Sequence, residues 1–423
     1  MNYWNRQKQE QKVKVNGAVH TIRDMGTVAF VILRKREGLL QCVYEEGSAD
    51  FELKDMKEAA TVEVEGILEE NEKAPNGIEI RMESVKILSE PEDEMMPLAI
   101  SKWKLNTSLE AKLNYRSISL RNIRERAKFR IQEGLTRAFR DFLYSQEFTE
   151  IHTPKIGAKG AEGGANIFKL EYFHRPAVLA QSPQFYKQMM VGVFDRVFET
   201  APVFRAEKHN TKRHLNEYTS LDFEMGYIDG FEDIMAMETG FLQYTMELLK
   251  KEYARELQIL NIEVPKTDNI PAVRFDEIKR LVSEKYDRKI KNPFDLEPEE
   301  ETLISRYAKE EWNADFDSLL ITHPKKRPFY AMDDPEDARF TLSFDLLFKG
   351  LEITTGGQRI HDYNMLVQKI EDRGMTQEGM EQYLDTFKHG MPPHGGLGIG
   401  LERLTMQLIG EENVREPASS REI

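Results

Sequence analysis

The chain has 423 residues, of which 40% are hydrophobic and 31% are charged, and its formal net charge is −14. This composition is typical of a globular protein, and the length exceeds what one hydrophobic core usually supports, so we expect two or three domains. The acidic balance argues against a protein that coats nucleic acid uniformly, although a local basic path remains possible.

Targeting and redox features are sparse. No run approaches the ~18 consecutive apolar residues of a membrane span, and the amino end has no signal-peptide core. The single cysteine, Cys42, excludes an intrachain disulfide framework and a cysteine-based zinc site. We therefore expect a cytoplasmic protein that has no membrane partner.

Residues 13 to about 90 show an all-β pattern. Five short Val/Ile-rich segments are separated by turn signals; they are Val13–Val15, Val28–Leu33, Leu39–Tyr44, Ala60–Leu68 and Ile78–Ile87. Five such strands in succession predict a small barrel of the oligonucleotide-binding type. Periodicity alone does not name a ligand, so a purely structural β module stays open at this point.

An acidic linker and a long helix follow the barrel. Ser89–Leu105 carries two prolines and has the composition of a linker. Apolar residues then recur at helical spacing from near Leu120, and a short strand with Phe148 and Ile151 ends at a proline. The apolar face of this helix would pack within its own domain or against a second subunit.

Two loops in the middle of the chain are candidates for ligand contact. Gly157–Phe168 is rich in Gly and Ala and is either a mobile lid or an ordinary flexible loop. Arg196–Tyr227 reads as strand, charged loop, strand, because apolar residues alternate in both arms. A hairpin of this kind holds fixed charge on a rigid frame, which suits recognition of a polyanion, although a solvated surface loop is the simpler interpretation.

The carboxyl-terminal half alternates between helical and strand patterns. Residues 240–320 are mostly helical, and no internal repeat is visible. Strand signals return in three segments and then in two glycine-rich ones, the last of which leads into a closing helix; the segments are Ser318–Thr322, Phe329–Met332, Thr341–Phe348, Leu351–Arg359 and Gly395–Arg403, and the helix is Leu404–Ile409.

Familiar catalytic motifs are missing from the sequence. There is no GxxxxGK[ST], no GxGxxG between a strand and its helix, no HExxH and no GxSxG. What remains is a set of arginines and carboxylates in loops. Chemistry that rests on charge positioning needs no protein nucleophile, and phosphoryl and nucleotidyl transfers belong to that class.

Five blocks in order carry a family resemblance. They are FRDFLYSQEFTEIHTP (139–154), QSPQFYKQ (181–188), FRAEKHNTKRH (204–214), LEITTGGQRIHDY (351–363) and GLGIGLERL (396–404). The first, third and last resemble motifs 1, 2 and 3 of the class II aminoacyl-tRNA synthetases, and the other two resemble blocks of the aspartyl enzymes of the archaeal and eukaryotic type. The resemblance extends from about residue 13 to residue 415.

The resemblance implies an architecture. The fold class would be α+β, with the antiparallel class II sheet flanked by helices and an amino-terminal five-stranded OB-type barrel. The expected domains are an anticodon-binding barrel (1–90), a hinge (91–115) and a catalytic domain (116–423) with a largely helical portion near 240–320. The family forms homodimers through the motif 1 helix and strand, and its partners are tRNA, ATP and L-aspartate.

The resemblance also implies roles for residues around ATP. Arg205 would contact the α-phosphate and the reacting carboxylate, and Arg403 would hold the γ-phosphate. Glu207 and Tyr218 would hold the adenine, while Arg213 and His214 would reach the outer phosphates or the reactants. Glu352 and Thr355 match positions that bind magnesium (Mg2+), which prefers hard oxygen ligands. The other matched ATP positions are Leu215, Gly400, Leu401 and Glu402.

For the amino acid, Lys187 and Arg359 match the pair that grips the side-chain carboxylate of aspartate. Two cations would reject asparagine, because its amide would leave both of them without a counter-charge. The remaining matched aspartate positions are Glu162 in the lid, Gln184, Arg205, Asp222 and Thr355. By sequence alone, Lys187 would be read as an ordinary surface lysine.

In the barrel, Phe30 and Gln41 match the family's pair for the central anticodon base, Phe by stacking and Gln by hydrogen bonding. Arg23 is a further candidate contact, and Phe30 as a core residue is the alternative. His20 is also expected near the anticodon, because His here, with Pro75, fits relatives that charge both tRNA(Asp) and tRNA(Asn).

Three possibilities remain open from the sequence. The chain could be an aspartate–tRNA ligase, a tRNA-independent amide-ligase paralogue, or a non-catalytic RNA-binding protein that keeps the fold. The barrel with Phe30 and Gln41 argues against the second. Retention of four matched residues argues against the third; they are Arg205, Glu352, Arg359 and Arg403. The end of the chain after Glu416 departs from the usual family pattern, and its effect is open.

Overall fold

The computed structural model describes residues 11–93, 95–158, 160, 167–207, 211–292, 296–322 and 327–418. They fall into two compact units, Met1–Arg126 and Ala127–Ile423. The first unit therefore includes the predicted hinge and the first residues of the predicted catalytic domain. Within the described ranges, no helix is both long enough and apolar enough to cross a membrane.

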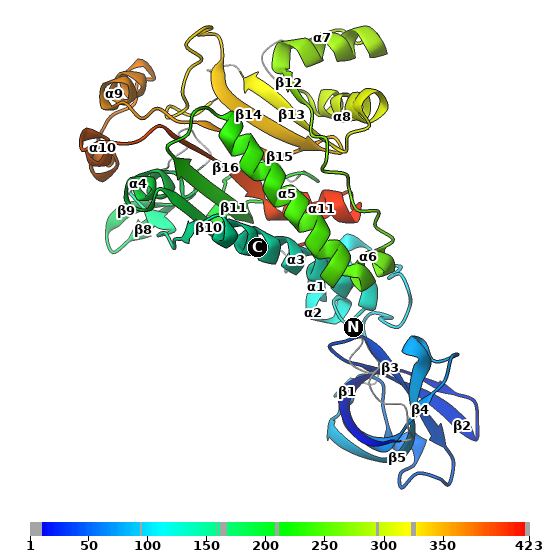
Figure 1. Cartoon of the computed structure of the whole chain (residues 1–423). Helices are drawn as coiled ribbons and strands as arrows, with labels where there is room; N and C mark the ends of the chain where they lie inside the picture. The colour runs from blue at the N-terminus through cyan, green and yellow to red at the C-terminus, as the bar shows by residue number, and fades with distance from the viewer. Residues whose placement is uncertain are drawn as a thin grey trace. The chain divides into compact units, whose positions relative to one another are not determined.

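The first unit is built on a closed five-stranded barrel with the order β1-β2-β3-β5-β4, as predicted (Figure 1). Its strands are β1 (Gln11–Asp24), β2 (Val28–Arg34), β3 (Leu39–Glu45), β4 (Thr61–Glu70) and β5 (Ile78–Ser89). Alternate residues of β2, Ala29, Val31 and Leu33, point inward and have no exposed surface. The period-two pattern of the sequence thus places the opposite set, with Phe30, on the outer face.

Strand β1 is much longer than the predicted Val13–Val15. Its outward residues are polar and therefore hide the strand from a pattern based on hydrophobic runs. The register slips inside it, since Val19 pairs with Leu33 but Thr21 pairs with Ile32. His20 is the extra residue of this bulge.

The predicted linker begins one residue too early, since Ser89 ends β5, and it contains no helix or strand among the described residues 90–93 and 95–105. Two short helices follow it, α1 (Leu109–Asn114) and α2 (Arg116–Ser119). Ser108 caps α1, because its hydroxyl accepts a hydrogen bond from the backbone N–H of Ala111.

The second unit is organised on an eight-stranded sheet in the order β12-β13-β14-β15-β16-β11-β10-β6. Its neighbouring strands are antiparallel except at the two ends, where β10–β6 and β12–β13 are parallel. The strands are β6 (Thr149–Glu150), β10 (Arg196–Phe204), β11 (Glu217–Gly226), β12 (Ala272–Arg274), β13 (Phe316–Thr322), β14 (Thr341–Phe348), β15 (Leu351–Gln358) and β16 (His394–Gly400). A small sheet of β7 (Ile156–Gly157), β8 (Lys169–Tyr172) and β9 (Arg175–Leu179) lies apart from it.

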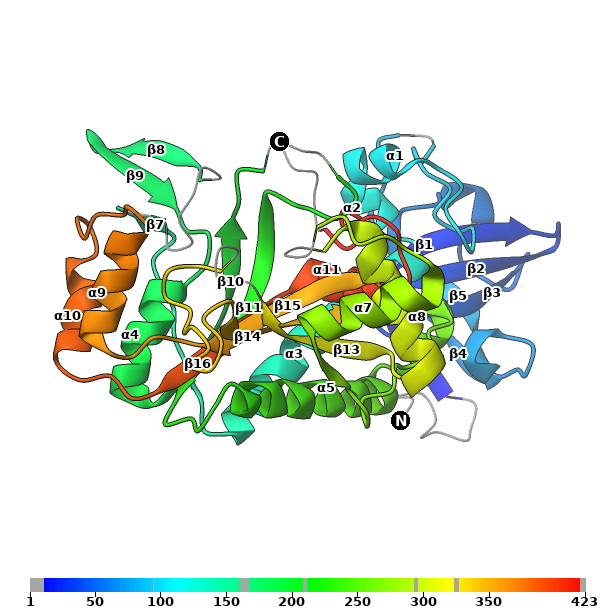
Figure 2. The same cartoon turned by 90° about the horizontal axis from the view of Figure 1, so that it is seen from above.

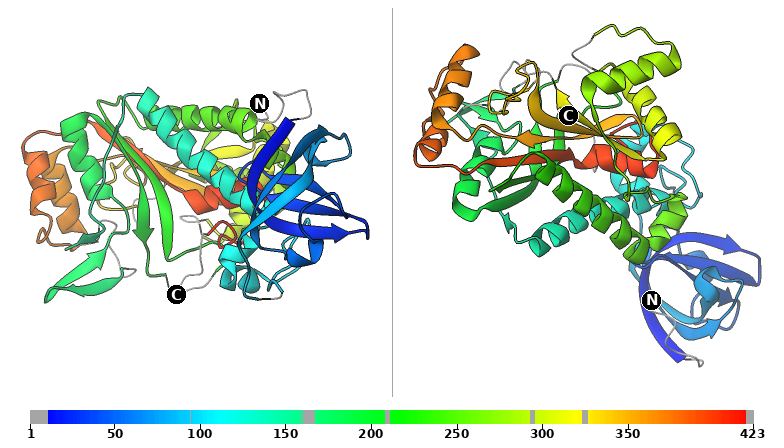
Figure 3. Two further views of the ribbon diagram at one scale, coloured as in Figure 1. Left: turned by 90° about the horizontal axis from the view of Figure 1, so that it is seen from below. Right: turned by 45° about the horizontal axis from the view of Figure 1, so that its top comes forward.

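One face of the large sheet is covered by α3 (Ile123–Ser145), α5 (Glu232–Glu252) and α11 (Leu401–Ile409), as Figure 2 shows. Their apolar residues form the main core with the inward side chains of β10, β11 and β16. Outside this core, α9 and α10 pack beside α4, and α7 packs beside α8 (Figure 3). The bounds of these helices, with α6, are α4 (Gln184–Phe194), α6 (Ala254–Leu260), α7 (Phe275–Tyr286), α8 (Pro298–Trp312), α9 (Tyr363–Asp372) and α10 (Glu381–Lys388).

The predicted charged hairpin is confirmed, because β10 and β11 pair in antiparallel register from Arg196–Met225 to Phe204–Glu217. Two other expectations need correction. Phe329–Met332 forms only an isolated bridge, between Ala331 and Arg359, and not a strand. The closing helix begins at Leu401, three residues earlier than predicted, because Gly400 already ends β16.

Candidate active site

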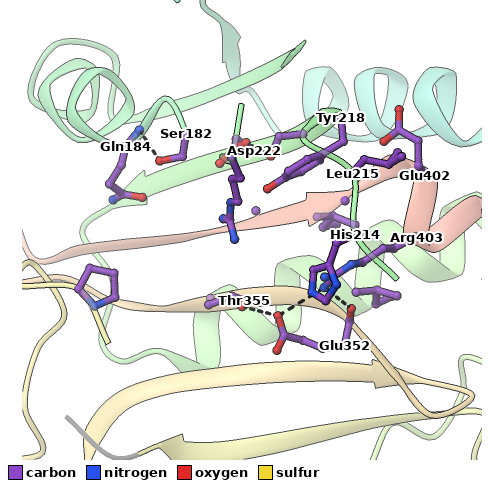
Figure 4. A pocket seen from close by; sticks show the side chains of 18 of the residues that line it. Ser182, Gln184, His214, Leu215, Tyr218, Asp222, Glu352, Thr355, Glu402 and Arg403 are labelled. Carbon is purple, nitrogen blue, oxygen red and sulfur yellow. Dashed lines mark hydrogen bonds and ion pairs between the residues drawn. The ribbon is translucent and has the colours of Figure 1, made fainter. Parts of the chain in front are cut away.

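The uncovered face of β11, β15 and β16 forms the floor of a cavity in the second unit. Alternation along β11 explains the division: Leu221 and Phe223 point into the helical core, whereas Tyr218, Ser220 and Asp222 line the cavity. Both faces of the strand are therefore in use, one for packing and one for polar groups, and Figure 4 shows Tyr218 and Asp222 on the polar face.

At one end of the cavity, Lys187 from α4 is held by two acceptors. Its Nζ donates to Asp222 Oδ1 and to the carbonyl oxygen of Leu397, both at 2.9 Å. It also lies 3.3 Å from Glu224 Oε2. Only 2% of the lysine side chain is exposed, so this is a desolvated ammonium and not the surface lysine that the bare sequence would suggest.

Arg359 is the second cation of this end. Its Nε donates to Glu224 Oε1 at 2.9 Å, and its Nη2 donates to the carbonyl oxygen of Gly396 at 2.9 Å. Gly396 is required for this approach, since a Cβ there would lie 2.2 Å from Glu224 Oε2. Burial opposes ionisation of Glu224, but Arg359 and Lys187 outweigh it and lower its pKa below the ordinary value. No pattern in the sequence distinguishes Glu224, which lies between apolar residues of β11.

A chain of hydrogen bonds between uncharged side chains lies beside Lys187 and Arg359. Tyr383 Oη donates to Gln188 Oε1 at 3.0 Å, and Gln188 Nε2 lies 2.8 Å from His394 Nε2. The other ring nitrogen, Nδ1, is 2.9 Å from the carbonyl oxygen of Pro392. Burial lowers the pKa of His394 to about 4, so the neutral ring donates through Nδ1 and accepts through Nε2. These groups fix α4 and β16 behind Lys187.

Gln184 and Ser182 line the cavity near Asp222 (Figure 4). Gln184 is 3% exposed, yet its Nε2 has no hydrogen-bond partner among the described residues. A buried amide in this state costs free energy unless a ligand completes it. Glu162, the lid residue of the prediction, lies outside the described residues.

The other end of the cavity combines an apolar slot with arginines. The guanidinium of Arg205 lies over the ring of Tyr218, 5.7 Å from its centroid. Leu215 packs with Tyr218 and with Val414 from the end of the chain. Val414 was not predicted, but its N–H donates to the carbonyl oxygen of Lys212 at 2.9 Å and so ties this segment to the hairpin loop. A flat apolar slot with an arginine at its mouth suits a purine nucleotide.

Glu207 and His214 lie on the hairpin side of the slot. His214 Nε2 is 3.7 Å from Glu207 Oε2, and its Nδ1 is 2.7 Å from the hydroxyl of Thr211. Burial and then the charge of Arg403 lower the pKa of His214, so the ring is neutral near pH 7.

Arg213 and Arg403 meet at the far side. Arg213 Nη2 donates to the carbonyl oxygen of Gly350 at 3.0 Å and pairs with Glu301 of α8. Arg403 Nε donates to the carbonyl oxygen of Arg213, and Nη1 to that of Glu352, both at 3.1 Å. The two guanidinium groups are thus oriented by backbone carbonyls, which leaves other donors for an anionic ligand.

Glu352 and Thr355 face the cavity together because β15 contains a bulge. Leu347 pairs with Glu352 but Leu346 pairs with Thr354, so Ile353 is an extra residue. The slip brings the Thr355 hydroxyl to 3.2 Å from Glu352 Oε1 (Figure 4).

Asp345 was missed by the sequence reasoning, and it lies opposite Thr355 in the β14–β15 register. Its side chain is 15% exposed, its carboxylate pairs with Arg327 at 2.5 Å, and desolvation raises its pKa. No group of three or more His, Cys, Asp or Glu among the described residues is arranged to hold a metal ion by itself. Magnesium often binds through one or two carboxylates and completes its shell with substrate phosphates and water, so this donor set fits such an ion.

Three residues near the start of α11 match ATP-binding positions of the family, but they do not all line the cavity. Gly400 lines the cavity at the end of β16, but Leu401 belongs to the helical core and is not among the lining residues. The oxygens of Glu402 accept from the N–H of Thr219 at 3.0 and 3.2 Å. Burial raises the pKa of Glu402 to about 7. Glu402 therefore lines the cavity with Gly400, whereas Leu401 packs into the core beneath them.

In the barrel, Arg23 and Phe30 are paired across β1 and β2, and Ile32 pairs with Gln41 across β2 and β3. Phe30 is half-buried on the outer face and does not belong to the barrel core, which removes the core alternative. Gln41 Nε2 donates to Glu79 Oε2 at 2.8 Å, a partner that the sequence did not reveal. His20 lies apart, buried at its bulge, with a pKa lowered to about 4 by burial and then by Arg34.

Comparison with protein families agrees with this geometry. The family described as tRNA synthetases class II (D, K and N) matches residues 108–418, and the OB-fold nucleic acid binding domain matches residues 13–88. The chain belongs to the class II tRNA synthetases. Both the predicted family and the predicted barrel are therefore confirmed, and the synthetase is an enzyme.

Several relatives of this chain within the family are named aspartate–tRNA ligases. The synthetase is 45% identical over 416 residues to the aspartate–tRNA(Asp/Asn) ligase of Deinococcus radiodurans, covering 97% of this chain and 94% of that one. It is 38% identical over 413 residues to the aspartate–tRNA(Asp) ligase of Pyrococcus furiosus, covering 96% and 93%. Among solved structures, asparaginyl-tRNA synthetase from Pyrococcus horikoshii superposes with a TM-score of 0.88 at 28% identity, covering 97% and 94%.

Proposed function

We propose that this synthetase is an aspartate–tRNA ligase that activates L-aspartate with ATP and transfers it to the 3′ end of tRNA. The observation that carries the proposal is a pair of buried cations at one end of the cavity. Lys187 and Arg359 both form an ion pair with Glu224. The aspartate–tRNA ligases among its relatives, at 37–45% identity, support the same substrate.

The charge balance of this corner explains the choice of amino acid. Lys187 and Arg359 face Asp222 and Glu224, so the four buried side chains sum to zero. An incoming aspartate adds a side-chain carboxylate for the two cations and an ammonium for Asp222, which keeps the corner neutral. Asparagine would bring the ammonium without the carboxylate and would leave one positive charge uncompensated in a desolvated site.

The activation of aspartate depends on how the other end of the cavity positions ATP. We assign the adenine to the slot of Tyr218 and Leu215, with Glu207 accepting from its amino group, and the outer phosphates to Arg213, His214 and Arg403. A carboxylate oxygen of aspartate then attacks the α-phosphorus, the bond to the β-phosphate breaks, and pyrophosphate leaves. Arg205 stabilises the charge that develops on the α-phosphoryl oxygens.

Transfer completes the reaction. The 3′-hydroxyl of the terminal adenosine of tRNA attacks the carbonyl carbon of aspartyl-adenylate, and AMP leaves. No protein nucleophile takes part, so both steps rest on orientation and electrostatics.

Glu352 and Thr355, with Asp345 behind them, would hold magnesium. When bound, the ion would neutralise phosphate charge. The two side chains share a face through the β15 bulge, and that orientation is the contribution of this chain.

Several further assignments belong to the same proposal. The enzyme is a cytoplasmic homodimer that pairs through α3 and β6, and the 1–90, 91–115 and 116–423 segments act as anticodon domain, hinge and catalytic domain. Tyr144 on α3 is 53% exposed, which suits an interface. Glu162 belongs to a lid over aspartate. Arg23, Phe30, Gln41 and His20 serve the anticodon.

We also propose that tRNA(Asn) is a second substrate. His20 and Pro75 motivate this assignment, and relatives at 38–45% identity are named Asp/Asn ligases, whereas relatives named Asp ligases stand at 37–38%. Charging assays with both purified transcripts test it, and aspartylation of tRNA(Asp) alone would refute it.

Aspartate-dependent ATP–pyrophosphate exchange tests the proposed activity itself. We expect exchange with aspartate and at least 100-fold less with asparagine, because a site built for two charges rejects the analogue that lacks one. Exchange that prefers asparagine, or no exchange with either amino acid, contradicts the proposal.

A further inference from the structure

A second hollow lies on the first unit and is lined by residues other than the base-facing ones. Its lining includes four cations, Arg34, Lys35, Arg36 and Arg126, and no carboxylate among the described residues. In a chain whose net charge is −14, a hollow with this lining is unusual.

Arg34 is the centre of this hollow. Its Nη1 is buried and has no hydrogen-bond partner among the described residues. Two other cations of the barrel have carboxylate partners: Lys12 pairs with Glu83 at 3.0 Å, and Arg81 pairs with Glu69 at 2.8 Å. A buried guanidinium donor without an acceptor costs free energy, so its presence indicates a ligand that accepts hydrogen bonds.

The neighbours of Arg34 add to this cost. Burial, followed by the charges of Arg121 and Arg126, lowers its pKa to about 10. Two of the surrounding side chains are nevertheless fixed, since Arg126 Nη1 donates to the carbonyl oxygen of Lys35 at 2.9 Å and Lys35 Nζ to that of Asn16 at 3.0 Å. The cations are thus held together against their mutual repulsion, which a bound anion would relieve.

The hollow and the base-facing residues share one strand. Arg34 ends β2, and Phe30 lies four residues earlier on the same outward face. At the rise of an antiparallel strand, four residues span about 13 Å. A single-stranded RNA segment that stacks a base on Phe30 can therefore reach Arg34 with its backbone.

We propose that Arg34, Arg36 and Arg126 form a phosphodiester site for the bound tRNA, next to the base-facing residues and distinct from them. This inference rests on the proposed function, because it requires tRNA as the ligand. The contact is to the backbone and carries no base preference, so it would serve tRNA(Asp) and tRNA(Asn) equally. Guanidinium groups match the geometry of phosphate oxygens, which explains why the cluster uses arginine.

The test compares three full-length proteins: wild type, Arg34→Gln and Lys12→Gln. Lys12 is a matched control, because it lies on the same barrel and its loss removes one charge that a carboxylate already compensates. Filter binding of a tRNA(Asp) transcript across ~50 to 200 mM salt gives the dissociation constant and its salt dependence. For Arg34→Gln we expect roughly three- to tenfold weaker binding and a salt slope reduced by about 0.9, with Lys12→Gln close to wild type.

Thermal unfolding distinguishes a ligand-binding role of Arg34 from a structural one, because the two roles predict different changes in the melting temperature. A structural arginine lowers the melting temperature when it is removed, whereas removal of an uncompensated Arg34 should leave it unchanged or raise it. Inorganic phosphate should raise the melting temperature of the wild type more than that of Arg34→Gln. If phosphate does so but tRNA affinity is unaffected, the site takes free phosphate and the RNA assignment is wrong.

The outcomes separate this inference from the proposed function. If wild type charges tRNA while Arg34→Gln keeps the wild-type affinity and salt slope, only the phosphodiester site is refuted. If wild type neither exchanges pyrophosphate nor charges tRNA, the proposed function fails first. Pyrophosphate exchange by Arg34→Gln should equal that of the wild type, because that reaction needs no tRNA.

Discussion

The guanidinium of Arg359 and the carboxylate of Glu224 form a buried ion pair, with Nε and Oε1 2.9 Å apart and neither side chain accessible beyond 7%. The same carboxylate lies 3.3 Å from Lys187. Glu224 therefore orients both cations of the proposed aspartate site without itself lining the cavity.

Replacing this carboxylate should weaken folding and binding together. We expect Glu224→Gln to lose about 3 kcal/mol of unfolding free energy, since two buried cations lose a counter-charge. The pKa of Glu224 is below its ordinary 4.5 in the folded state, so its stabilisation is present above pH 4.5 and is lost as the pH falls through the folded value. Urea unfolding at several pH values should show the difference from wild type shrinking below pH 4.5, and a constant difference would contradict this assignment.

Lys187→Met keeps the volume of the lysine stem and removes its charge. We expect aspartate-dependent pyrophosphate exchange to fall by roughly 100-fold or more in kcat/KM, because one of two side-chain contacts to aspartate is lost in a desolvated pocket. Lys250→Gln removes an exposed lysine of α5 and is the matched control, with expected wild-type exchange. Equal losses in both variants would mean that the effect is not specific to the site.

Glu238 offers a pH test that is independent of catalysis. Burial raises its pKa to about 8, and its Oε1 has no partner among the described residues. Because the folded pKa lies above the unfolded 4.5, its contribution to stability is full below pH 4.5 and is lost as the pH rises towards 8. Glu238→Gln should therefore gain on the order of 2 kcal/mol over wild type between pH 5 and pH 8 in urea unfolding. A gain that does not depend on pH would contradict the assigned pKa.

Phe30→Ala separates anticodon recognition from activation. Loss of a stacking ring should raise the KM for tRNA by roughly tenfold, since a base–aromatic stack contributes about 1–3 kcal/mol. Pyrophosphate exchange should not change, and the melting temperature should change little because Phe30 is outside the barrel core. A large fall in melting temperature would instead assign Phe30 to packing.

Much of the fold followed from alternation, which predicted β10, β11 and the barrel strands from apolar periodicity alone. The same rule failed at β1, where polar outward residues and the bulge at His20 masked a long strand. It would also place Glu352 and Thr355 on opposite faces, and only the extra residue Ile353 corrects that. The local periodicity of apolar residues does not predict such register slips.

The site was predictable to the extent that family motifs mark it. Lys187 has the local pattern of a surface lysine, and its role came from the resemblance. Glu224 and Asp345 were missed because a carboxylate in a strand shows no spacing that distinguishes a buried partner from a solvated one. Their function depends on contacts to residues more than a hundred positions away, or across a strand register, which sequence spacing does not encode.

The central claim is aspartylation of tRNA, and the most direct measurement is aspartate attached to a tRNA(Asp) transcript by wild type and by Arg205→Ala. We predict ATP-dependent charging with aspartate by the wild type, and loss of charging by Arg205→Ala with an unchanged melting temperature. Undiminished charging by Arg205→Ala would contradict the assignment of the hairpin arginine. No charging of the transcript by the wild type, under conditions in which pyrophosphate exchange proceeds, would contradict the account of the enzyme as a tRNA ligase.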